Sequence, residues 1–72
     1  MDVDEFNSAL SMLEKEFKYH LLEFWLSDGR TITGLHMAMN KTGLIRVEGG
    51  RPSGPMFFHA HGVIAIQPVI ET

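Results

Sequence analysis

Apolar residues recur every three or four positions in the first part of the chain. The spacings are four, three and four, and the residues are Phe6, Leu10, Leu13 and Phe17. This is the period of one face of an α-helix. Asp2 or Asp4 can cap the start of such a helix, and an acidic first turn suits the positive end of the helix dipole. The pattern predicts an amphipathic helix over about residues 3–19.

Beyond the helix the period changes to two. Leu22, Phe24 and Leu26 are separated by single residues, which predicts a strand with one buried face. Further strands are predicted over residues 30–39, 44–48, 56–61 and 63–69. The segments 28–29, 40–43 and 49–55 are rich in turn-forming residues, and Gly62 separates the last two strands. Gly34 lies inside the longest strand, where a glycine often marks a bend.

These elements define the expected fold class as mainly β (α+β). An N-terminal α-helix is followed by a five-stranded, strongly bent antiparallel sheet that forms a small barrel. The chain is expected to be one domain, residues 1–72, with the barrel over about 20–70.

The amino-acid composition limits the ways in which so small a fold can be stabilised. A chain of 72 residues without cysteine has a marginal core and no disulfides, so self-association or a histidine-bound metal is left as extra support. The acidic N-terminus and the lack of a long apolar run predict a cytoplasmic protein without a membrane span. The net charge of −3 disfavours a broad electrostatic grip on nucleic acid.

Three segments carry a resemblance to a known family. Residues 26–34 read Leu-Ser-Asp-Gly-Arg-Thr-Ile-Thr-Gly, Asn40 stands where an aspartate is usual, and residues 61–66 read His-Gly-Val-Ile-Ala-Ile. In this order the chain resembles the Sm-like (LSm) family, and within it the bacterial Hfq branch. The resemblance implies that the barrel is Sm-like or SH3-like. It also implies a homo-oligomeric ring, a hexamer or heptamer, that binds single-stranded RNA without a cofactor.

The resemblance also implies two RNA-binding faces. His61 and Asn40 would lie on the pore side, and His59 would join them because residues two apart on a strand share a face. Trp25, an exposed platform for base stacking, would lie on the opposite face with Arg30 and Thr31. Each feature has a plainer interpretation: histidines without a ligand, or a tryptophan packed under the helix or against a neighbouring subunit.

Other functions are weighed on the same residues. His59 and His61 could bind a metal only with ligands from neighbouring subunits, because the sequence positions no third ligand, and no metal site is predicted. No enzyme is predicted, since Gly49-Gly50 lacks the lysine and helix of a phosphate-binding loop. The alternative is an oligomeric scaffold without RNA binding, favoured by the acidic balance and by Ala60, which replaces a lysine of Hfq.

Overall fold

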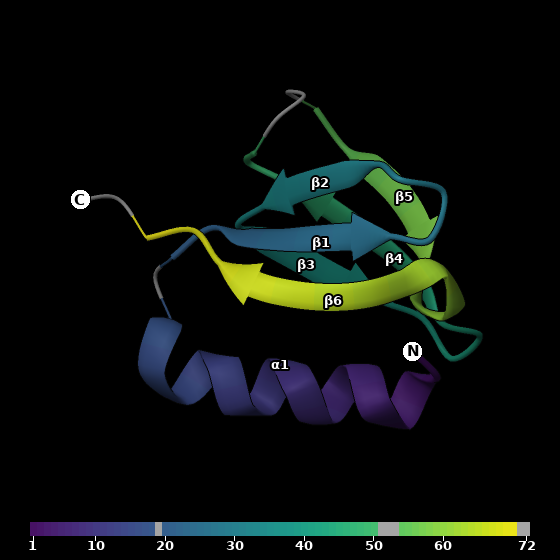
Figure 1. Cartoon of the computed structure of the whole chain (residues 1–72), viewed down its shortest axis with the longest axis horizontal. Helices are drawn as coiled ribbons and strands as arrows, with labels where there is room; N and C mark the ends of the chain where they lie inside the picture. The colour runs from purple at the N-terminus through teal and green to yellow at the C-terminus, as the bar shows by residue number, and fades with distance from the viewer. Residues whose placement is uncertain (19, 51–53, 71–72) are drawn as a thin grey trace.

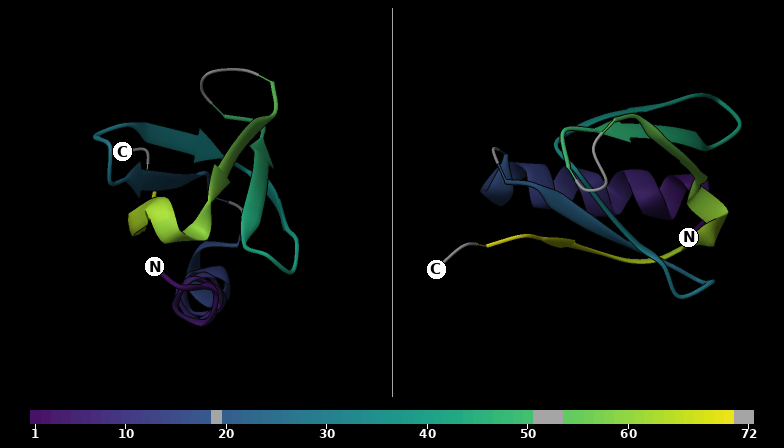
Figure 2. Two further views of the ribbon diagram at one scale, coloured as in Figure 1. Left: turned by 90° about the vertical axis from the view of Figure 1, so that its right-hand side faces the viewer. Right: turned by 90° about the horizontal axis from the view of Figure 1, so that it is seen from above.

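Two three-stranded antiparallel sheets and one helix form the computed structural model, which describes residues 1–18, 20–50 and 54–70. The first sheet has the order β2 (Thr31–Gly34), β1 (Leu22–Leu26), β6 (Val63–Pro68). The second has the order β3 (His36–Met39), β4 (Leu44–Glu48), β5 (Met56–His59). Helix α1 (Val3–Phe17) runs alongside the sheets, and a short 3-10 helix, η1 (Ala60–Gly62), joins β5 to β6 (Figures 1 and 2).

The predicted helix is confirmed over residues 3–17. A capping box fixes its start: the Asp2 carboxylate accepts from the Glu5 amide at 2.7 Å, and the Glu5 carboxylate accepts from the Asp2 amide at 3.2 Å. Phe6 and Leu10 are buried, as the apolar spacing requires. Tyr19, in the expected last turn, lies outside the described residues. No helix in the described ranges is long and apolar enough to cross a membrane.

The Asp2 cap makes the helix sensitive to acid. The hydrogen bond from the Glu5 amide lowers the pKa of Asp2 below that of an ordinary aspartate. A lowered folded-state pKa means that the stabilisation is present above the unfolded-state pKa, about 3.9, and is lost as pH falls through the lower folded value. We expect Asp2→Ala to lower the thermal midpoint by about 5 °C at pH 7.

The matched control is Asp2→Asn, which keeps an oxygen acceptor but does not titrate. We expect Asp2→Asn to retain most of the thermal midpoint at pH 7 and to lose less of it than the wild type between pH 5 and pH 2. Melting curves followed by circular dichroism measure both effects. Equal acid sensitivity in the two proteins would show that Asp2 does not contribute to it.

The predicted long strand over residues 30–39 is divided in two at Leu35. β2 pairs with β1 as far as Gly34, whereas β3 pairs with β4. The Leu35 amide already donates to the Glu48 carbonyl at 2.9 Å. The chain therefore changes its pairing partner within one residue, next to the glycine where a bend was expected.

The single five-stranded sheet is not confirmed. The predicted strand 56–61 ends at His59, because residues 60–62 turn through η1 before β6 begins. β5 lies at the edge of the second sheet and β6 at the edge of the first, and no pairing among the described residues closes a barrel. Part of the predicted loop, residues 51–53, lies outside the described ranges.

One buried cluster joins the helix to both sheets. The ring of Phe24 in β1 lies 6.0 Å from that of Phe6 in α1 and 5.2 Å from that of Phe58 in β5. The whole cluster consists of Phe6, Leu10, Phe24, Leu26, Ile32, Ile45, Val47, Phe58, Ala60 and Val63. Because successive strand residues face opposite ways, Trp25 points away from this core.

Candidate functional site

The turn between β3 and β4 is organised by Asn40. Its side-chain oxygen accepts from the amides of Thr42 and Leu44, both at 3.0 Å, and from the Thr42 hydroxyl at 2.7 Å. This is the local bonding by which asparagine stabilises a turn. The oxygen of this predicted RNA contact is therefore used within the turn, whereas its amide nitrogen has no partner among the described residues.

The structure brings His59 and His61 to the same turn. His59 Nε2 lies 2.6 Å from the Thr42 carbonyl, and the Ala60 amide donates to the Gly43 carbonyl at 2.9 Å. The expectation that His59 and His61 share a strand face is wrong, because His61 lies in η1. The two rings are nevertheless neighbours, with centroids 4.7 Å apart. His61, His59 and Asn40 thus meet at the end of the molecule where η1 packs against the turn.

Trp25 occupies the outer surface of the first sheet. It is 43% exposed, and its indole nitrogen donates to the Glu23 carboxylate at 2.7 Å. The same carboxylate oxygen accepts from the side-chain amide nitrogen of Gln67 in β6 at 3.0 Å. The interpretation in which Trp25 packs under the helix is wrong, since α1 contacts the Phe24 side of the sheet.

Thr31 lies beside Trp25, whereas Arg30 precedes it in the hairpin, where its carbonyl accepts from the Leu26 amide at 2.9 Å. Thr31 is exposed and pairs directly with Trp25 across the β1–β2 ladder. The Arg30 guanidinium donates to the Asp28 carboxylate at 2.8 Å and remains 63% exposed. The hydrogen bond from the Arg30 backbone amide lowers the pKa of Asp28 most. The hydrogen bond from the Arg30 side chain and its positive charge lower it further. A phosphate approaching Arg30 would therefore meet a cation that is already paired.

Glu23 and Gln67 were not predicted as site residues from the sequence. The alternation of β1 places Glu23 on the same face as Trp25, so the sequence contained a signal for this residue. The sequence contained no such signal for Gln67, because its position opposite Glu23 depends on the pairing of β6 with β1. Together Glu23, Trp25 and Gln67 form a hydrogen-bonded row that holds the indole in place.

The described residues contain no group of three or more metal-ligating side chains. Both ring nitrogens of His59 also have hydrogen-bond partners, Thr42 and the His61 amide. Within the described chain, binding of a metal by the histidine pair would therefore require the ring of His59 to leave its present contacts.

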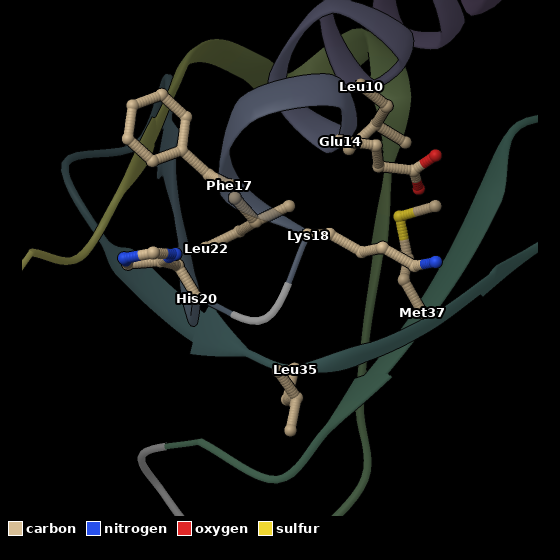
Figure 3. Close-up of a pocket in the computed structure, with 8 residues that line it drawn as sticks. All are labelled: Leu10, Glu14, Phe17, Lys18, His20, Leu22, Leu35 and Met37. Atoms are coloured by element: carbon tan, nitrogen blue, oxygen red, sulfur yellow. The ribbon is translucent and has the colours of Figure 1, made fainter.

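A small cavity lies at the other end of the molecule, where α1 ends and the β2–β3 bend begins (Figure 3). Its volume is about 260 Å³, and Phe17 and His20 line one side of it while Glu14 and Met37 lie at the other. The predicted site residues are all elsewhere. The cavity is therefore separate from both candidate faces.

The two candidate faces thus rest on the geometry of this chain. No protein-family model matches the sequence, and comparisons with curated proteins and with solved structures find no significant match.

Proposed function

We propose that this chain is an Sm-like, ring-forming protein that binds single-stranded RNA in the manner of Hfq. The observation that carries the proposal is the meeting of the 40–43 turn with η1, two segments far apart in sequence. Their junction exposes His61 and the amide nitrogen of Asn40, groups suited to hydrogen bonds with unpaired bases. In this proposal β2 and β3 are the two halves of one bent Sm-like strand.

The row around Trp25 supports a second RNA contact. A half-exposed indole on the outer face of the sheet offers a base a stacking surface, and its bond to Glu23 reduces the entropy lost on binding. Glu23 and the paired Arg30 leave this face with little positive charge. Stacking and hydrogen bonding, more than phosphate neutralisation, would therefore supply the affinity.

Trp25→Ala is expected to weaken RNA binding. Loss of one stacked base costs about 1–3 kcal/mol, which corresponds to a roughly 5- to 150-fold rise in Kd. Fluorescence anisotropy with short A-rich and U-rich RNAs measures this effect, and Trp25→Phe should retain most of the affinity. Met12→Ala is the control, since it truncates an apolar side chain that is 72% exposed on α1.

The intrinsic fluorescence of the wild-type protein also reports on RNA binding. Trp25 is the only tryptophan, so a base stacked on it should quench the intrinsic fluorescence. Absence of binding to both RNAs at micromolar protein, at low and at moderate salt, would refute RNA binding. Binding with unchanged affinity in Trp25→Ala would refute the role of this face alone.

Ring assembly is supported by the two different sheet edges. β5 ends the second sheet and β6 ends the first, and each carries a large exposed hydrophobic residue, Phe57 and Ile64. An outer strand offers backbone groups for pairing with another chain. A contact between two unlike edges is head-to-tail, and repeated contacts of this kind form a ring when the rotation between neighbouring subunits closes, and a filament when it does not. Light scattering tests this, and a strict monomer at working concentrations would refute the ring.

The alternative function is an Sm-like scaffold that assembles but does not bind RNA. The pairing of Arg30 with Asp28 and the net charge of −3 favour it. A stable ring in light scattering that shows no RNA binding in anisotropy would select this alternative.

A further inference from the structure

His59 connects two segments that the chain keeps 17 residues apart. The half-buried imidazole lies between the 40–43 turn and η1, and each of its nitrogens contacts a different segment. Nε2 is 2.6 Å from the Thr42 carbonyl oxygen. Nδ1 is 3.2 Å from the His61 amide nitrogen and caps the start of η1. The ring therefore bridges the turn and the residue that we propose for RNA contact.

These two partners are compatible with only one protonation state of the ring. A backbone carbonyl can only accept, so Nε2 must carry a proton. A backbone amide can only donate, so Nδ1 must be bare. We infer that His59 is a positioning residue, held as the neutral tautomer with its proton on Nε2, which fixes η1 and thereby His61 against the 40–43 turn.

Two further contacts support this role. The His61 ring meets the His59 ring edge-on, with 65° between the planes, so His59 orients the side chain as well as the backbone of His61. Gly43 leaves room for the bridge: its φ of +94° favours glycine, and a Cβ there would lie 2.9 Å from His59 Cε1. Among the described residues, the bridge occupies both ring nitrogens of His59 but neither of those of His61.

The tautomer is tested without any ligand. Nitrogen-15 NMR of the imidazole groups distinguishes a protonated nitrogen from a bare one, and His59→Asn assigns the resonances of His59. We expect a protonated Nε2 and a bare Nδ1 for His59 at neutral pH. A proton on Nδ1, or rapid exchange between the two tautomers, would overturn the inference whether or not the protein binds RNA.

The effect on the ligand rests on the proposed function and needs a second experiment. His59→Phe keeps a ring of similar size but removes both bonds, and we expect it to weaken binding of U-rich RNA about tenfold. His59→Asn should restore part of the affinity, because its side-chain oxygen can replace Nδ1 as the acceptor for the His61 amide. His20→Phe, at the far end of the molecule, should leave the affinity unchanged.

A double-mutant cycle separates positioning from general destabilisation. If His59 acts through His61, then His59→Phe should have no further effect on RNA binding in a His61→Ala background. Additive losses would overturn the positioning role. Failure of the wild type to bind RNA would instead contradict the proposed function, with the NMR result deciding the tautomer independently.

Discussion

Phe24→Ala is expected to remove a large part of the protein's free energy of unfolding. Phe24 is 1% exposed, and its ring contacts Phe6 of the helix and Phe58 of the second sheet. Its removal leaves a cavity where the helix and the two sheets pack together. Truncation of a buried phenylalanine costs about 3–5 kcal/mol, whereas a chain of this length has a total stability of roughly 4–11 kcal/mol.

Urea denaturation followed by circular dichroism measures this loss. The matched control is Phe57→Ala, the same chemical change at a side chain that is 58% exposed. It should cost about 0.5 kcal/mol or less at low protein concentration, where assembly contributes little. A Phe24→Ala protein with the midpoint of the wild type would show that Phe24 does not join the helix to the sheets.

Gly34→Ala is expected to lower the free energy of unfolding as well. A Cβ at residue 34 would lie 2.7 Å from the Cβ of Val47, which is itself buried in the core. Both atoms are close to the backbone, so relief requires β2 and β4 to separate at the bend. Overpacking of this kind costs about 1–3 kcal/mol.

The chain offers a control for Gly34 and a rescue. A Cβ at Gly62 meets nothing within 4 Å, so Gly62→Ala should leave the urea midpoint unchanged or slightly raised. Val47→Ala makes room at the bend, and the double variant should be more stable than the sum of the two single losses implies. Strict additivity of Gly34→Ala and Val47→Ala would contradict the close approach.

The elements with a clear period were the ones that could be predicted. The helix, β1 and β4 follow from alternation or from three-and-four spacing, and the bend follows from Gly34. The change of partner at Leu35 could not be predicted, because pairing depends on the Glu48 carbonyl and not on any local pattern. The start of η1 at Ala60 was missed because the segment around Ala60 alternates like a strand.

The candidate site likewise has parts that could be predicted from the sequence and parts that could not. Trp25 and Thr31 could be placed side by side from a hairpin and its register. Asn40 was predicted as a ligand, but its oxygen proves to hold the turn, a role that depends on the amides of Thr42 and Leu44. The bridge through His59 could not be foreseen, because it requires β5 to end beside the 40–43 turn.

The pairing of β6 with β1 also determines when the protein can fold. Leu26 pairs with Val63 and Leu22 with Pro68, partners that are 37 and 46 residues apart in the chain. Closing so long a loop costs conformational entropy before the contacts between β1 and β6 can form and compensate for it. Folding is slower for this reason when paired residues are far apart in the chain. During synthesis the first sheet therefore lacks its third strand until Pro68 has left the ribosome. Until then the edge of β1 that faces β6, from Leu22 to Leu26, has no partner strand.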